Sequence, residues 1–358
     1  FGSIYAVATI FSSLLFIWAG KKIDDFRLLN YSFFVIILLF FSTLFFSFIN
    51  SIYFLAVGIF LMRFSGQGLM SHASATTISR YFQKSRGKAL SIIWLGLSSA
   101  EFLLPFLAIY FISMYSWKVV WQGIAVVIIL ILPLVITKTI KKINLESREK
   151  NSIKLTKIKI KEWKRKEVLR DFRFYIISLN MLAMPWICTG IFVYQSFITD
   201  SKLWDIYTIP KAFMVYSIAS IITLFSSGFL VDKFTSRKLI PIMNIPLLLA
   251  MVVLFYSKQE ISAYFFLGLI GISNGFGNIL GSSTWAEIYG VKYIGSIKAL
   301  TTAFMVFSTA LGTAVFGILI DNGFTIENIA FICGTYIIIS ISILMLFRKT
   351  LEPIKLEN

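Results

Sequence analysis

Histidine and cysteine, the residues that most often carry metal or covalent chemistry, are almost missing from this chain. Its 358 residues include one histidine, His72, and two cysteines, Cys188 and Cys333. A single histidine excludes a histidine-based metal or proton-relay cluster, and we interpret His72 as a hydrogen-bonded packing residue. The cysteines fall in apolar segments without paired spacing, so we interpret them as packing residues too. The sequence therefore predicts no metal site, no cofactor and no enzyme activity, since an enzyme needs a convergent set such as paired acids with histidines.

Charge is also scarce, and long apolar runs take its place. Only 14% of the residues are charged, 58% are hydrophobic, and the mean hydropathy is +0.82. A bilayer core of ~30 Å needs roughly 20 mostly apolar residues per helix, and backbone groups in lipid must be satisfied within the segment. The chain is therefore predicted to be an all-α polytopic membrane protein. Eleven segments qualify as transmembrane helices: 1–20, 29–49, 52–79, 89–112, 117–137, 174–199, 207–231, 239–257, 262–286, 293–320 and 327–347.

A short motif occurs twice at a fixed distance. The pairs that recur 208 residues apart are Gly20 and Gly228, Asp24 and Asp232, Phe26 and Phe234, Tyr81 and Tyr289, and Gly87 and Gly295. The repeat predicts two membrane units, 1–137 and 174–358, joined by a basic linker, 138–173. The same offset places the counterpart of 174–199 before residue 1. We therefore expect one more helix upstream, which would complete two pseudo-symmetric six-helix bundles.

The net charge of +17 is placed unevenly. Alternate loops hold 29 of the 34 basic residues, a count that takes Lys298 as a loop residue, and the opposite loops hold only 4. By the positive-inside rule the linker and the C-terminus are cytoplasmic, and the basicity reflects topology, with no nucleic-acid partner implied. We expect a monomer in a bacterial inner membrane. We also expect the linker to lie on anionic lipid headgroups, with these side chains in the interface: Ile153, Leu155, Ile158, Ile160 and Trp163.

The repeated motif resembles the signature loop of the major facilitator superfamily, which lies between the second and third helices of each half. The second copy matches better, because the first has Asp25 where a basic residue is usual and Arg27 where a second glycine is usual. Glycine allows two helices to approach closely, and the aspartate can accept hydrogen bonds from a neighbouring helix N-terminus. The resemblance implies a conformational latch made of Gly20, Asp24, Gly228, Asp232 and Arg237.

The segment 52–79 resembles the fourth helix of the monocarboxylate and oxalate/formate branches of that superfamily. It carries Arg63 deep inside the apolar run, with Gln67 four residues later on the same helical face. An intramembrane arginine is a functional candidate by default. Glu101 is the one acid deep inside the first half. It is either the partner of Arg63 or a proton-coupling residue, and the sequence leaves both interpretations open.

The second half offers amides where the first offers a cation. Asn274 and Asn278 share a face, and the resemblance implies that Asn180 and Gln195 in the seventh helix contribute polar groups to a central cavity. The candidate substrate-binding residues are Arg63, Gln67, Asn180, Gln195, Asn274 and Asn278.

We predict a secondary active transporter that moves a small solute by alternating access. A buried arginine with amide neighbours favours an organic anion such as a carboxylate, with Glu101 as the proton-coupling candidate of a symporter. Drug or metabolite efflux by proton antiport stays open as an alternative. So does a transporter-derived sensor without flux.

Overall fold

The structure is a computed structural model that describes residues 2–82, 85–143 and 160–354. The described residues form helices and no strand, so the prediction of an all-α fold is confirmed. The first group of helices is α1 (Gly2–Ala19), the short turn η1 (Gly20–Asp24), α2 (Leu28–Phe46), α3 (Ile52–Met62), η2 (Arg63–Met70), α4 (Ser71–Tyr81), α5 (Arg86–Met114) and α6 (Trp117–Ile143).

The second group follows the linker. It consists of α8 (Arg165–Val168), α9 (Phe172–Val193), α10 (Gln195–Lys202), α11 (Thr208–Phe234), α12 (Ser236–Leu239), η3 (Ile240–Ile242), α13 (Ile245–Tyr256), α14 (Ile261–Tyr289), α15 (Ile294–Asp321), α16 (Ile326–Leu346) and η4 (Arg348–Leu351). Ten helices within the described ranges are long and apolar enough to cross a membrane. The remaining expected segment, 89–112, coincides with α5, part of whose side chains are not described.

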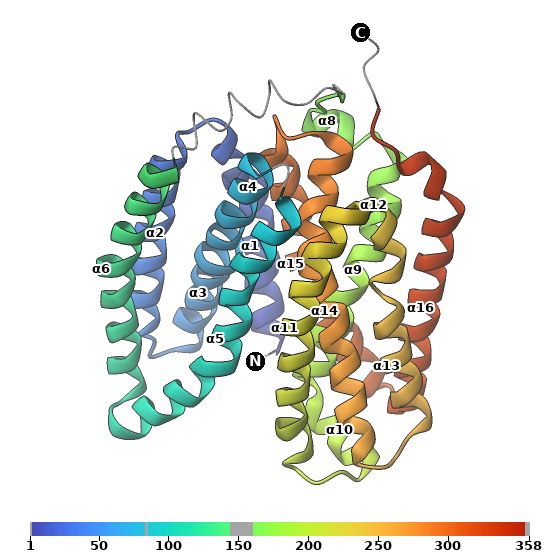
Figure 1. The fold of residues 1–358 in the computed structure, drawn as a ribbon. Helices are drawn as coiled ribbons and strands as arrows, with labels where there is room; N and C mark the ends of the chain where they lie inside the picture. Colours follow the sequence, from blue (N-terminus) through green and yellow to red (C-terminus); the bar gives the residue numbers. More distant parts are fainter. Residues whose placement is uncertain (1, 83–84, 144–159, 355–358) are drawn as a thin grey trace.

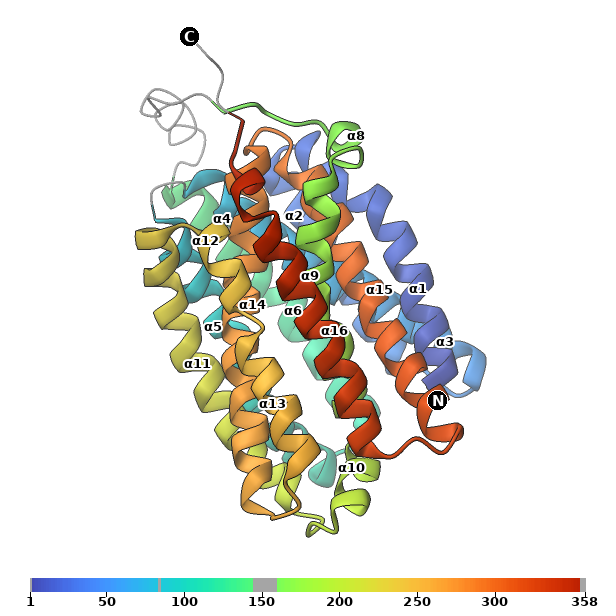
Figure 2. The ribbon, with the colours of Figure 1, turned by 90° about the vertical axis from the view of Figure 1, so that its right-hand side faces the viewer.

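The two groups lie side by side as two halves of one bundle (Figure 1). The helix α8, the turn after α1 and the turn after α4 lie at one end, which we call the linker side; α10 lies at the opposite end (Figure 1). The halves meet along two seams, α1 against α15 and α5 against α11. Figure 2 shows α1 and α15 running side by side. The 208-residue repeat relates α1 to α11 and α5 to α15, so each seam joins one member of each related pair.

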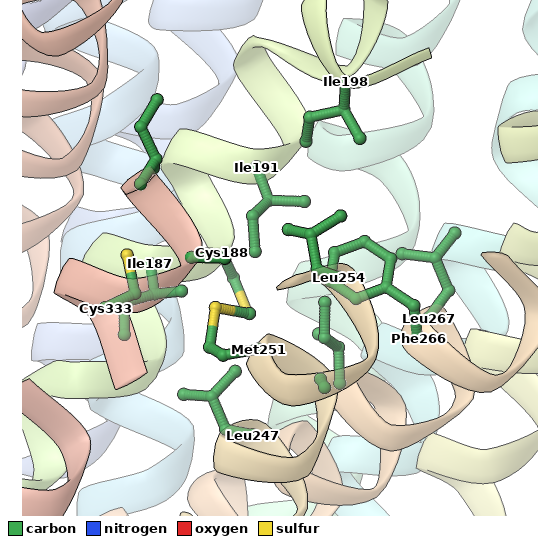
Figure 3. Close-up of a cluster of buried hydrophobic side chains, with 14 of the residues drawn as sticks. Ile187, Cys188, Ile191, Ile198, Leu247, Met251, Leu254, Phe266, Leu267 and Cys333 are labelled. Atoms are coloured by element: carbon green, nitrogen blue, oxygen red, sulfur yellow. The ribbon is translucent and has the colours of Figure 1, made fainter. Parts of the chain in front are cut away.

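A dry core holds the second half together. Side chains from α9, α10, α13, α14 and α16 pack into one cluster, part of which is drawn in Figure 3. Cys188 and Cys333 are both buried in this cluster, and neither forms a disulfide. The interpretation as a packing residue is confirmed for Cys333, whereas Cys188 also lines the cavity between the halves.

The helix that contains Arg63 departs from a regular α-helix. Between α3 and α4, the eight residues of η2 form a π-helix, whose i→i+5 hydrogen bonds make a wider turn. Short π segments occur frequently at functional sites. Arg63 and Gln67, which were predicted to share a face, nevertheless lie in different environments, as described below.

The end of the linker docks onto the protein. Trp163 is only 8% exposed, its backbone N–H donates to the carbonyl of Tyr289 at 3.0 Å, and its ring packs edge-on against the Tyr289 ring. The expectation that Trp163 dips into lipid headgroups is therefore wrong, because its indole is buried against the end of α14. Ile153, Leu155 and Ile158 lie outside the described residues.

Nearby polar contacts fix this docked segment. Glu162 accepts a hydrogen bond from the backbone N–H of Lys292 at 2.8 Å, and Arg165 donates to the carbonyl of Ile17 in α1 at 3.1 Å. Glu167 accepts from Lys161 at 2.8 Å and from the backbone of Lys164 at 2.7 Å, which lowers the pKa of its carboxyl below the usual value. The segment 160–168 thus contacts both halves at the linker side.

Candidate functional site

Two carboxylates join the halves on the linker side. Asp24, at the end of η1, accepts hydrogen bonds from the backbone N–H groups of Gly295 at 3.0 Å and Ser296 at 2.6 Å, in the first turn of α15. It also forms an ion pair with Arg80 of its own half. The N-terminus of a helix has unpaired N–H groups and a partial positive charge, so it stabilises an anion placed there.

The second carboxylate makes the related contact at the other seam. Asp232 accepts from the backbone N–H groups of Gly87 at 2.8 Å and Lys88 at 3.2 Å, in the first turn of α5. A Cβ atom at Gly87 would collide with the carbonyl oxygen of Gly228 and crowd Asp232. The contact between an aspartate and a neighbouring helix N-terminus is therefore present at both copies, and their role as a latch stays a prediction.

Arg237 serves a different connection from the two aspartates. Its guanidinium lies 3.3 Å from a carboxylate oxygen of Glu287 in α14 and 3.5 Å from one of Glu352. Glu287 also accepts from the backbone N–H of Ser236 at 2.8 Å. All of these residues belong to the second half, so Arg237 connects elements within that half.

A cavity of about 420 Å³ lies between the halves. It is lined from η2, α4, α5, α9, α11, α14 and α15, and its polar lining residues are Gln67, Ser71, His72, Trp94, Ser178, Thr189, Tyr216, Asn274, Asn278, Ser282, Lys298, Thr301 and Thr302. Two buried polar atoms on this lining, the Oε1 of Gln67 and the Nε1 of Trp94, have no hydrogen-bond partner among the described residues. Asn274 donates to the hydroxyl of Ser220 at 3.1 Å, which fixes its amide. Both of these unpaired atoms, on Gln67 and Trp94, are buried.

Lys298 is the cation of this cavity, and the sequence analysis missed it. It lies in the second turn of α15, is 3% exposed, and lines the cavity. Its ammonium donates to the hydroxyl of Ser79 in α4 at 3.3 Å, and no described carboxylate forms an ion pair with it. The prediction that Lys298 is a basic loop residue was wrong, because α15 begins at Ile294 and carries the lysine inside the bundle. An early lysine on a helix rich in small residues was the signal available in the sequence.

His72 is held by hydrogen bonds at both ring nitrogens. Its Nε2 lies 3.0 Å from the carbonyl oxygen of Gly20, and its Nδ1 lies 3.3 Å from the hydroxyl of Thr76. The ring also packs edge-on against Phe16 at 5.3 Å between centroids. The prediction of a hydrogen-bonded packing residue is confirmed.

The structure brings together only half of the expected substrate-binding residues. Gln67, Asn274 and Asn278 line the cavity. Arg63 does not, because its guanidinium stacks over the ring of Tyr5 in α1 at 4.4 Å. The side chain of Glu101 lies outside the described part, so its two interpretations stay open.

The other two expected residues lie in the second half, away from the cavity lining. Asn180 is fully buried; its backbone carbonyl accepts from the side-chain amide of Asn244 at 2.6 Å, and its own side-chain NH₂ lies 3.5 Å from the hydroxyl of Ser340. It therefore ties α9 to α13 and α16. Gln195 is exposed at the start of α10, at the end opposite the linker side.

Comparison with known proteins agrees with this arrangement. The family model of the Major Facilitator Superfamily matches residues 1–210. The chain belongs to the Major Facilitator Superfamily. A search of curated proteins returns no match.

Among solved structures, the chain is similar to a bacterial homologue of the iron transporter ferroportin, in an outward-facing state with soaked iron. The similarity has a TM-score of 0.70 at 15% identity and covers 96% of this chain and 89% of that one. At this identity the likeness shows the fold. Membership of the Major Facilitator Superfamily points to a secondary transporter rather than an enzyme.

Proposed function

We propose that this protein is a secondary active transporter for a small organic anion, and that the anion binds in the cavity between the halves. The observation that carries the proposal is the charge of the lining. Its described residues include one cation, Lys298, and no aspartate or glutamate. A buried charge is costly unless it is paired, so this site is completed by a negatively charged solute.

The neighbours of Lys298 suit a carboxylate. An ammonium attracts a carboxylate oxygen as a point charge, while the side-chain NH₂ groups of Asn274 and Asn278 can donate hydrogen bonds to it. Met181, Met184 and Phe192 supply apolar surface for the hydrocarbon part of an organic acid. The likeness of 52–79 to the monocarboxylate and oxalate/formate branches supports the same class of cargo.

The two aspartate contacts support alternating access. We propose that the linker side is cytoplasmic, and that Asp24 and Asp232 close it in this conformation by joining each half to the other. Opening toward that side requires both contacts to break. Since both aspartates bind helix N-termini at related positions, a rocking motion of one half against the other would release them together.

Uptake into proteoliposomes tests the proposal. The purified protein is reconstituted, and accumulation of radiolabelled lactate and oxalate is compared with that of betaine, tetraethylammonium and Fe²⁺. We expect uptake of a carboxylate, competed by other carboxylates. Lys298→Met should abolish it, whereas Lys211→Met, which removes an exposed lysine, should leave it unchanged.

Other outcomes would replace the proposal with a named alternative. Uptake of Fe²⁺ in place of carboxylates would extend the likeness to the ferroportin homologue from fold to cargo. Export of tetraethylammonium would indicate drug efflux. Carboxylate binding without flux would indicate a sensor.

A further inference from the structure

The hydrogen bond of Lys298 crosses from one half of the protein to the other. Lys298 belongs to α15 in the second half, and its described partner, Ser79, belongs to α4 in the first half. The Ser79 hydroxyl is fully buried and also lies 3.2 Å from the carbonyl oxygen of Ser282 in α14. Ser79 is therefore a node through which α4 contacts two helices of the other half.

The Ser79 hydroxyl is a weak hydrogen-bond partner for a buried ammonium. The hydroxyl is neutral, and its oxygen lies 3.3 Å from the ammonium nitrogen. The acid at position 101 occupies a different level of the bundle. Its backbone is about 22 Å along α5 from the linker-side start of that helix, whereas Lys298 is about 6 Å from the linker-side start of α15. In a low-dielectric interior an ammonium is attracted more strongly to a full negative charge than to a hydroxyl. A bound anion would therefore compete with Ser79 for Lys298.

Lys298 also lies next to one of the two linker-side contacts. Gly295 and Ser296, which donate to Asp24, occupy the first turn of α15, and Lys298 follows in the next turn. The same side chain lines the cavity. A change in what Lys298 binds therefore acts on the helix whose N-terminus holds Asp24.

We propose that Lys298 couples the occupancy of the cavity to opening of the linker side. An anionic cargo draws the ammonium away from Ser79 and so removes a contact between the halves, one turn from the Asp24 contact. With the cavity empty, Lys298 stays on Ser79 and the linker side stays closed. This coupling role rests on the proposed transport of an organic anion and adds the residue through which the cargo acts.

A cysteine reporter measures the opening directly. Ser91 in α5 is 3% exposed and lies against Gly228 of α11, so it is buried in the seam between the halves. Ser91→Cys is added to the wild-type chain, whose own two cysteines are buried. Its labelling rate by a maleimide is measured in detergent, with and without lactate and oxalate, and the rate of the unsubstituted protein is subtracted. Faster labelling reports opening of this seam.

Two variants and a matched control define the expected result. Ser79→Ala removes the hydroxyl that contacts both Lys298 and the carbonyl of Ser282, and it should raise labelling without any carboxylate by at least roughly two- to tenfold, the range that one lost hydrogen bond gives. Lys298→Met should raise it similarly and remove the response to carboxylates, whereas the parent reporter should respond to them. Ser283→Ala removes a buried hydroxyl bonded within its own helix at 2.9 Å, and it should label like the parent.

The outcomes separate this inference from the proposed function. Absence of carboxylate uptake by the reconstituted wild-type protein would overturn the proposed function. Carboxylate uptake by the wild-type protein, combined with parental labelling in Ser79→Ala and a retained carboxylate response in Lys298→Met, would overturn the coupling role alone. Monodisperse elution of every variant on size exclusion shows that a change in labelling is not a failure to fold.

Discussion

The carboxylate of Asp232 accepts a hydrogen bond from the backbone N–H of Gly87, 2.8 Å away, and thereby joins the second half of the chain to the first. The residues related to this pair by the 208-residue repeat make the same contact with the halves exchanged: Asp24 of the first half accepts from the backbone N–H of Gly295 of the second at 3.0 Å. Each half therefore supplies one carboxylate and one helix N-terminus. The two contacts between the halves on the linker side therefore have the same chemistry.

Neutralising these carboxylates should loosen the linker side. Asp24→Asn and Asp232→Asn each remove an anion from a helix N-terminus, at a cost of roughly 0.3–2 kcal/mol. We expect faster maleimide labelling of Ser91→Cys and slower transport turnover, with cargo affinity changed less. Asp25→Asn is the control, because that exposed carboxylate lies 3.9 Å from Lys22 and contacts no helix N-terminus of the other half. Unchanged turnover and labelling in both variants would show that these acids are ordinary loop residues.

A methyl group at Gly87 should force the α5–α11 seam apart. The Cβ of Gly87→Ala would meet the carbonyl of Gly228, and overpacking of this kind typically costs about 1–3 kcal/mol. Gly96→Ala in the same helix is the control, since no described atom lies within 4 Å of its added Cβ. Thermal unfolding in detergent should show a lower midpoint for Gly87→Ala, and an equal or higher one for Gly96→Ala. A midpoint for Gly87→Ala equal to that of the wild-type protein would mean that the seam tolerates the methyl group.

Arg63 and Lys298 should differ in their effect on cargo binding. Lys298 lines the cavity, whereas Arg63 stacks on Tyr5 outside its lining. Lys298→Met should abolish the stabilisation by lactate or oxalate in a thermal-shift assay, and Arg63→Gln should retain it. The opposite result would restore Arg63 as the substrate cation, as the sequence analysis expected, and would require a conformation in which it faces the cavity.

Glu101 is the candidate for proton coupling, and its substitution tests that role. If carboxylate uptake is driven by protons through this side chain, wild-type uptake should increase as the pH outside the liposome falls. Glu101→Gln cannot exchange a proton, so its uptake should lose the pH dependence while cargo binding persists. Uptake that still follows the pH gradient in Glu101→Gln would remove this residue from the coupling step.

The orientation in the membrane has a direct test. Cysteines placed at the exposed positions Lys166 and Arg348 should resist an impermeant thiol reagent in intact cells, because the charge distribution places them in the cytoplasm. Cysteines at Asp205 and Lys258, near the opposite end, should react. A reversed pattern would invert the assignment of the linker side.

Several features of this protein follow from its sequence alone. Length and hydropathy specify the spans, because a helix in lipid must be apolar along its whole length. The repeated motif identifies Asp24 and Asp232, and the same offset identifies Gly87 and Gly295, whose N–H groups they bind. The residues could be identified because each belongs to a short repeated motif at the end of a helix. Which helix N-terminus each aspartate binds was decided by the packing of the two halves, because the partners are 145 and 271 residues apart in the sequence.

The tertiary structure decided which polar side chains of the helices point into the cavity. A membrane helix is apolar toward lipid and toward its neighbours, so periodicity does not reveal which side meets the cavity. Packing turned Lys298 into the cavity, the Asn180 side chain toward Ser340 of α16, and Trp163 onto Tyr289. It also placed Gln67 on the cavity and Arg63 on Tyr5. The sequence by itself determined the membrane fold and the ends of its helices, and only the packing of the two halves decided which charge faces the cargo.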